Sequence, residues 1–396
     1  MNALLAALCL ILGVAVALVV PGGAAAVLFC AGAAVVAAAA LFRIDDQRSF
    51  LLQIFFGGLL ARVAVGALIY AFRLQEFFGG DAYTYDGIAH ALLDTWKGHT
   101  QYKDLVVVWM DGGTGWGMIY MVAYIYYIVG RNMLAVQLFN AVVGAATAPV
   151  IFLCARHIFQ NTRVARVAAF AVAFYPSLVL WSAQGLKDGP IVFLLALAML
   201  ATLKLGERMS LTYLAVLAGT MGCLLSFRFY VFFMVAAAVG GAFVIGMRRV
   251  TGQGLVRQMA VVIMVGLSLT YVGVLRTAGE KYEQYGNLQA VQTSRADLAT
   301  SANSGFNREV DVSTSSGAIS AIPLGMVYLL FAPFPWQLAS LRQSITLPEM
   351  LVWWASFPLL CLGVWFTLRH RLRQALPIII FTAMLTLAYS IFQGNV

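Results

Sequence analysis

The chain has 396 residues, of which 62% are hydrophobic and only 10% are charged. A soluble globular domain normally carries about 25% charged residues, so this composition excludes that class. The net charge of +9 favours basic cytoplasmic loops over nucleic-acid binding, because no basic stripe is interleaved with aromatic residues. Apolar runs long enough to cross a bilayer, about 20 residues each, recur along the chain and predict a polytopic membrane protein surrounded by membrane lipids.

Each long apolar run is predicted to be helical, because lipid offers no hydrogen bonds to the backbone. The fold class is therefore all-α, a transmembrane helical bundle with about eleven spans. The predicted spans are 3–20, 23–42, 51–73, 133–155, 165–184, 189–204, 211–227, 229–247, 258–276, 347–368 and 374–391. Two shorter apolar segments, 114–130 and 319–337, are flanked by Gly or Pro, and this pattern fits a span as well as an interfacial or re-entrant helix.

Basic residues fix the predicted orientation. They cluster at Arg43/Arg48, Arg156/Arg163/Arg166, Lys204/Arg208, Arg248/Arg249/Arg257 and Arg369/Arg371/Arg373. The positive-inside rule places all of these clusters in the cytoplasm, which holds only if 114–130 and 319–337 do not complete a crossing. The segments that then face outward are 74–132, the turn at Gly185–Asp188, the turn at Arg228 and the loop 277–318.

The chain divides into four predicted parts. Residues 1–49 form two N-terminal helices, and they lack a basic start and a clear cleavage site, so we read a retained helix rather than a signal peptide. Residues 50–276 form the main membrane module, with 74–132 as its outer loop. Residues 277–318 are polar and predict a flexible outer loop, and 319–396 form C-terminal helices. The five cysteines lie in apolar runs without CxxC spacing and predict core residues rather than disulfides or metal ligands.

The outer stretch GGDAYTYDGIAHALLDTWKGH, residues 79–99, concentrates polar groups in an apolar chain. Gly79 and Gly80 allow a sharp turn, and Asp81 can cap a helix. One helix face is apolar: Tyr85, Ile88, Ala89, Leu92 and Trp96. The opposite face is polar: Asp86, His90, Asp94 and Lys97. Because helix capping does not require an acid in this setting, we favour a functional role for Asp81 over a structural one.

The sequence GDAYTYDGIAHALL, with Asp81, Tyr85 and Ala89 in a D-x3-Y-x3-A pattern, is followed by a short aromatic segment and the run from YYIVGRNMLAVQLF to AQGLKDGPIVFLLALAML. Residues 50–205 thereby resemble the amino-terminal half of the GT-C superfamily of membrane glycosyltransferases. They are most similar to bacterial relatives of the aminoarabinose and protein O-mannosyl transferases, which use polyprenyl-phosphate sugars. Two departures stand out: Ala82 follows Asp81 where the family often has Asp-Glu, and two extra helices precede the module.

The resemblance implies catalytic roles for Asp81 and Asp188. Asp81 would act as a base or hold a divalent cation (Mg²⁺, Mn²⁺ or Ca²⁺), with His90 as a weaker candidate ligand. Asp188 opens a predicted helix beside Lys187, where anions are favoured, although a capped helix end with a snorkelling lysine is the structural alternative. Tyr85, Asp86, Lys187 and Arg228 are assigned to substrate binding. Arg228 would grip a phosphate or reach the lipid headgroups.

Arg62 is a separate case, because it lies deep in the predicted span 51–73. Intramembrane charges are costly and usually face a cavity or a partner. Two readings stand: contact with a lipid phosphate, or pairing with an acid elsewhere in the chain.

The resemblance implies an inverting GT-C glycosyltransferase in the bacterial cytoplasmic membrane, and the predicted orientation places its site on the outer face. The donor would be a polyprenyl-phosphate sugar, and the acceptor a glycan, a lipid or an envelope polymer. One alternative is a polysaccharide polymerase or ligase that uses lipid-linked oligosaccharides, with 277–318 as a lid. The other is a flippase or transporter, which would place its acids at mid-membrane rather than in outward loops.

Overall fold

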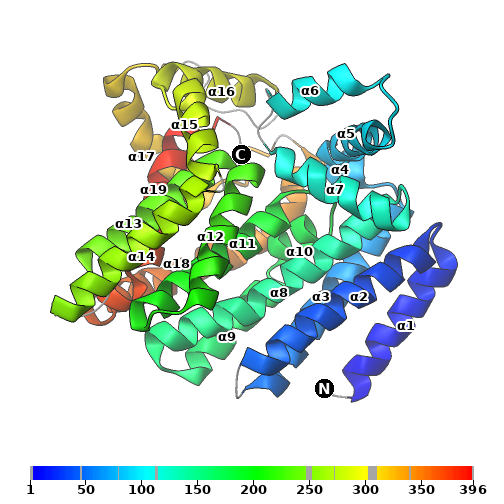
Figure 1. Ribbon diagram of the computed structural model, residues 1–396, viewed down its shortest axis with the longest axis horizontal. Helices are drawn as coiled ribbons and strands as arrows, with labels where there is room; N and C mark the ends of the chain where they lie inside the picture. The colour runs from blue at the N-terminus through cyan, green and yellow to red at the C-terminus, as the bar shows by residue number, and fades with distance from the viewer. Residues whose placement is uncertain are drawn as a thin grey trace. The chain divides into compact units, whose positions relative to one another are not determined.

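The computed structural model describes residues 3–44, 47–78, 80–111, 115–246, 252–271, 273–301, 310–338 and 340–394. Within these ranges every regular element is a helix and no strand occurs, so the all-α prediction is confirmed (Figure 1). The chain forms two compact units. The first comprises Met1–Lys204 and Leu211–Phe232, and the second comprises Leu205–Ser210 and Phe233–Val396.

The first unit is built around one buried helix, α8. Its helices are α1 (Ala3–Val19), α2 (Gly23–Ile44), α3 (Arg48–Ala71), α4 (Gln75–Phe78), α5 (Asp81–Trp96), α6 (Lys103–Asp111), α7 (Trp116–Val129), α8 (Met133–Phe159), α9 (Thr162–Phe174), α10 (Pro176–Ser182), α11 (Asp188–Glu207) and α12 (Leu211–Phe227). Helix α8 packs against α2, α3, α9 and α10, so it forms the centre against which the other elements are placed.

The second unit contains most of α13 (Phe229–Ile245), then α14 (Gly252–Tyr271), α15 (Val274–Tyr285), α16 (Leu288–Ser301), α17 (Ser315–Phe331), α18 (Leu341–His370) and α19 (Leu372–Phe392). Helices α17 and α19 pack closely, because Gly325 leaves room for the backbone at Ser390. The indole nitrogens of Trp353 and Trp354 in α18 donate to the carbonyls of Leu330 and Phe331, at 2.7 and 3.1 Å. These bonds fix α18 beside the end of α17.

Six described helices are long and apolar enough to cross a membrane, or up to eight if two bent helix pairs each count as one span. The expected eleven spans are therefore not confirmed. The difference comes from helices such as α1, α12 and α13, each 17 residues long. A helix of that length rises only about 25 Å, which is less than the ~30 Å hydrocarbon core. Segment 114–130 contains the short apolar helix α7, and segment 319–337 overlaps the short apolar helix α17.

The prediction of a flexible loop over 277–318 was wrong for its residues in α15 and α16, which are helical. Arg295 of α16 is buried and donates to the carbonyls of Ile391 and Gln393, at 2.9 and 2.6 Å. These carbonyls belong to the end of α19, where a helix lacks internal donors. A polar helix held by such a contact has no apolar run to reveal it in the sequence.

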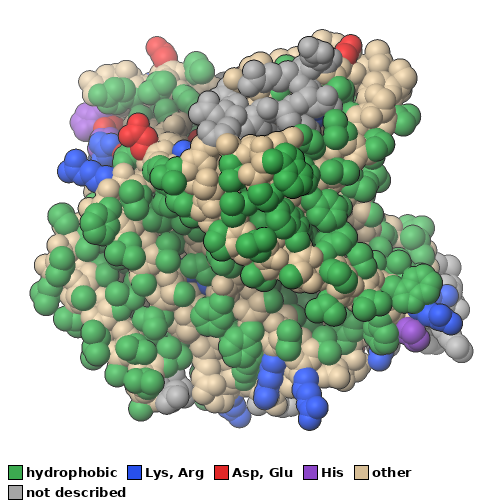
Figure 2. Space-filling view, turned by 180° about the vertical axis from the view of Figure 1, so that it is seen from behind, with side chains coloured by type: hydrophobic (Ala, Val, Ile, Leu, Met, Phe, Trp, Pro, Cys, Tyr) green, Lys and Arg blue, Asp and Glu red, His purple; other side chains and the backbone are tan. Residues whose placement is uncertain are grey.

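The surface of the chain is strongly apolar. Figure 2 shows hydrophobic side chains spread over most of the face drawn, with charged side chains near its edges. Helix α18, for example, buries none of its residues, and Leu359, Trp365 and Leu362 are each more than half exposed. Exposed apolar area on this scale would be a liability in water but is expected against lipid.

Candidate active site

Helix α5 carries Asp81, one of the two predicted catalytic acids. The helix begins at Asp81, but its N-cap is Gly80 and no side chain caps it. The capping interpretation of Asp81 was therefore wrong, and its carboxylate stands exposed at the positive end of the helix. Gly79 lies outside the described residues.

The predicted apolar face of α5 is confirmed by burial. Tyr85, Ile88, Ala89 and Leu92 are all buried. The helix packs against α7, and the ring of Trp96 lies 5.1 Å, centroid to centroid, from the ring of Tyr124. This packing fixes α5 on α7 within the first unit.

The structure corrects the environment expected for Asp86, which was predicted to lie on the polar face of this helix. Asp86 is buried, and one carboxylate oxygen accepts from the hydroxyl of Tyr126 at 2.5 Å. The other accepts from the guanidinium of Arg131, also at 2.5 Å, and this hydrogen bond raises the pKa of Arg131. The structure thus gives Asp86 the role of joining α5 to the α7–α8 junction. Both of its oxygens are engaged inside the protein, so its assignment to substrate binding finds no support here.

His90 pairs with Asp94 one turn along the same helix, at 3.1 Å. No group of three or more His, Cys, Asp or Glu side chains suited to a metal occurs in the part of the chain that the structure describes. The protein side chains around His90 thus offer a local ion pair and no ready metal cage.

The second part of the predicted site, Lys187 and Asp188, lies at the end of the turn 183–187. This turn joins α10 to α11, so that Asp188 is the first residue of α11 and Lys187 precedes it. Arg228, between α12 and α13, lies 3.5 Å from the Asp188 carboxylate, and its guanidinium sits 5.6 Å from the centre of the Tyr230 ring. The structure thus brings together an arginine and an acid that are 40 positions apart in the sequence.

Electrostatic effects link this pair to Asp81. Burial raises the pKa of Tyr85, and the charges of Asp81 and Asp188 raise it further, while Arg228 lowers it. Burial also lowers the pKa of Lys187, and Arg228 adds to this, while Asp188 and Asp81 act in the opposite direction. The charges of two carboxylates and one guanidinium, those of Asp81, Asp188 and Arg228, therefore act on both Tyr85 and Lys187. Five of the predicted site residues share one place, because α5, the 183–187 turn and the α12–α13 junction meet there.

Gly115 explains how α7 reaches this place. A Cβ atom on it would lie 3.3 Å from both Lys187 Nζ and the Phe227 carbonyl oxygen, and its φ of +98° is in the left-handed region. Glycine adopts that conformation at little cost. Gly115 was not among the predicted site residues, although it lies in the glycine-rich motif DGGTGWG, which was a visible signal in the sequence.

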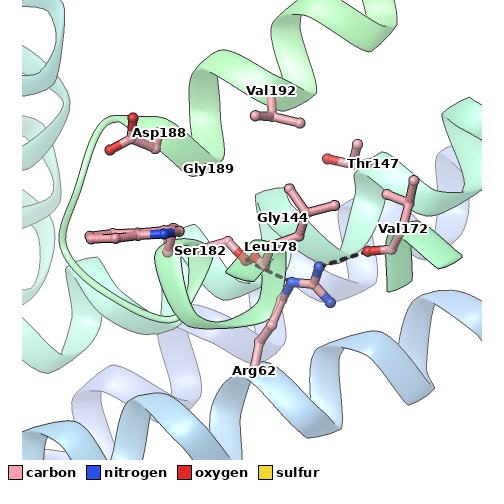
Figure 3. A pocket seen from close by; sticks show the side chains of 10 residues that line it. Arg62, Gly144, Thr147, Val172, Leu178, Ser182, Asp188, Gly189 and Val192 are labelled. Atoms are coloured by element: carbon pink, nitrogen blue, oxygen red, sulfur yellow. Dashed lines mark hydrogen bonds between the residues drawn. The ribbon is translucent and has the colours of Figure 1, made fainter. Parts of the chain in front are cut away.

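A cavity of about 250 Å³ lies beside Asp188 (Figure 3). Its walls are mainly apolar and come from α3, α8, α9, α10 and α11. The lining residues are Arg62, Gly144, Thr147, Val172, Leu178, Trp181, Ser182, Asp188, Gly189 and Val192. Asp188 and Arg62 are thus charged members of the lining, and the carboxylate stands at the start of α11.

Arg62 does not pair with an acid, one of the two roles predicted for it. It is 1% exposed and donates four hydrogen bonds, to the Ser182 hydroxyl and to the carbonyls of Gly58, Ala173 and Val172. Within the described ranges no ion pair joins Arg62 to an acid. Its partners are the backbone at the junction of α9 and α10 and one hydroxyl, so neither a lipid phosphate nor an acid is needed to explain its burial.

Residues 116–272 match the model of the dolichyl-phosphate-mannose-protein mannosyltransferase family. That family is a GT-C family, so the match confirms the resemblance seen in the sequence and supports a GT-C-like membrane glycosyltransferase. The matched residues include Lys187, Asp188 and Arg228, whereas Asp81 and Tyr85 precede them. No curated protein matches the chain.

Proposed function

We propose that this protein transfers a sugar from a polyprenyl-phosphate-linked donor to a glycan, lipid or envelope-polymer acceptor. The observation that carries this proposal is the ion pair of Arg228 with Asp188, together with the charges of Asp81, Asp188 and Arg228 that act on both Tyr85 and Lys187. Two cations suit a lipid phosphate, and an exposed carboxylate suits the acceptor hydroxyl. The match to a family named for a lipid-phosphate sugar donor supports the same chemistry.

The mechanism assigns a role to each charged group. Lys187 and Arg228 hold the donor phosphate, and Asp188 orients Arg228 through their ion pair. An anion beside Lys187 would favour its protonated form and offset the effect of burial on its pKa. The acceptor oxygen attacks the anomeric carbon while Asp81 takes its proton. The bond from that carbon to the phosphate oxygen breaks, and polyprenyl phosphate leaves. A single displacement of this kind inverts the anomeric configuration.

This chemistry is tested by giving the purified protein a radiolabelled polyprenyl-phosphate sugar in nanodiscs, together with envelope glycans and lipids. We expect the label to move to an acceptor while polyprenyl phosphate is released. A donor that remains intact with every acceptor fraction, although it binds, would contradict the proposal.

We place the site on the outer face of a bacterial cytoplasmic membrane, because this orientation keeps the basic clusters inside. A topology reporter fused after Gly286 is expected to read as external, and one fused after Arg163 as cytoplasmic. The opposite reporter result at either position would place the site on the other face of the membrane. It would contradict a donor bound from the outer side.

We also propose that Asp81 binds a divalent cation, Mg²⁺, Mn²⁺ or Ca²⁺, once the donor is present. These ions bind oxygen ligands such as a carboxylate, phosphate oxygens and water. Mg²⁺ in particular is usually bound by one or two carboxylates together with substrate phosphates and water. We expect chelation with EDTA to lower donor turnover by at least about tenfold, and added Mg²⁺ to restore it. Unchanged turnover in EDTA would contradict the proposal of a bound cation, and proton transfer would then be the only role of Asp81.

A further inference from the structure

The side chain of Asn140 in α8 holds the 183–187 turn by hydrogen bonds. This side chain is fully buried, and its Nδ2 atom donates to the carbonyls of Gln184 and Leu186, both at 2.7 Å. Both amide hydrogens are thereby used on one turn. Two carbonyls that flank Gly185 are fixed by one side chain, immediately before Lys187 and Asp188.

Arg62 holds the segment that leads into this turn. The predicted helix 165–184 is broken into α9 and α10, which meet at 53°. Pro176 has no N–H, so the carbonyl of Val172 loses its helical donor. Arg62 replaces it, donating to Val172 O at 3.3 Å and to Ala173 O at 2.7 Å.

The same guanidinium also reaches the far end of α10. Its Nε donates to Ser182 Oγ at 2.7 Å, and Ser182 in turn donates to the carbonyl of Leu178. Arg62 therefore joins the end of α9 to the end of α10, one residue before the turn begins (Figure 3). Gly144 of α8 permits this contact, because a Cβ there would lie 3.0 Å from Arg62 Nε and would overlap Ser182.

We propose that Asn140 and Arg62 are positioning residues, which preset the 183–187 turn so that Lys187 and Asp188 meet the donor in a fixed geometry. This inference rests on the proposed function of that site. Charges aimed at a reacting phosphate act best when they need no rearrangement during the reaction. A buried guanidinium is costly in a membrane protein, and an apolar side chain could fill the same space at lower cost. Fixing a turn that carries two reactive groups accounts for that cost.

The proposal is tested first on the turn itself. In a background without the native cysteines, Lys187→Cys supplies a thiol whose alkylation rate is followed by mass spectrometry. Adding Asn140→Leu, which keeps the volume but removes both donors, is expected to raise that rate at least about fivefold. Asn140→Ser, which retains one hydroxyl donor, should give an intermediate rate. Thr202→Val is the control: it removes an equally buried group, whose hydroxyl bonds only to Ala198 of its own helix.

The second test asks whether Asn140 acts through Asp188. Asn140→Leu should lower kcat for donor turnover at least about tenfold, because small displacements of positioned groups are expensive. In an Asp188→Asn background the same substitution should cost less than about twofold, since residues that act as a unit are not additive.

Alkylation rates equal to those of the control, together with losses that multiply, would overturn the positioning role. If the wild-type protein turns over no donor, the proposed function fails. The alkylation rate alone then decides whether Asn140 holds the turn. If Asn140→Leu does not accumulate in the membrane, the milder Asn140→Ser carries both measurements.

Discussion

Asp81→Asn is expected to lower the rate of sugar transfer by at least about a hundredfold, the scale of losing a general base. The amide has the same size as the carboxylate but cannot take the acceptor proton. Asp81 is exposed and does not cap α5, so the substitution should leave the fold intact. The measurement is kcat for transfer from a labelled donor, with the variant purified at wild-type yield.

Asp104→Asn is the matched control for this variant. Asp104 is also an exposed acid in the first turn of a helix, α6. We expect its transfer rate to stay within about twofold of the wild type, as for most surface substitutions. Equal losses in the two variants would mean that general outer-surface charge matters, and near-normal transfer in Asp81→Asn would remove Asp81 from the mechanism.

Arg228→Lys should insert normally but bind the polyprenyl-phosphate donor at least about threefold more weakly, because lysine cannot form a bidentate pair with phosphate. It would also lose the planar contact with the Tyr230 ring. The measurement is the donor Kd by native mass spectrometry in nanodiscs. If Arg228 only reached the headgroups, lysine would replace it fully.

Arg276→Lys controls for the loss of any exposed guanidinium. Arg276 lies on α15 and pairs with Glu280 of the same helix, at 3.1 Å. Its donor affinity should equal that of the wild type. Donor binding by Arg228→Lys that matches this control would assign Arg228 to the lipid surface.

The helices were predictable because lipid leaves an apolar run few alternatives. The ends of α2, α8, α11, α12 and α19 lie close to the predicted positions for that reason. The same reasoning identified Lys187, Asp188 and Arg228, since charges at the ends of apolar runs stand out. It could not count the spans, because helices of 17 residues fall just below the length that crosses a bilayer.

Contacts between distant segments escaped the sequence. Asp86 is buried because Arg131 and Tyr126 reach it from 45 and 40 positions away, and no local pattern encodes that pairing. Arg62 likewise uses backbone carbonyls about 110 positions away, which become available only where Pro176 breaks a helix. The polar helices α15 and α16 were missed because hydropathy identifies lipid contact and not helix formation as such.

The most direct test of the central claim is a structure of the protein with a polyprenyl-phosphate sugar bound. The proposal predicts the phosphate within hydrogen-bond distance of both Lys187 and Arg228, with the anomeric carbon facing Asp81. A phosphate seated elsewhere, for example against Arg131 or the basic residues 156–166, would contradict the assigned site.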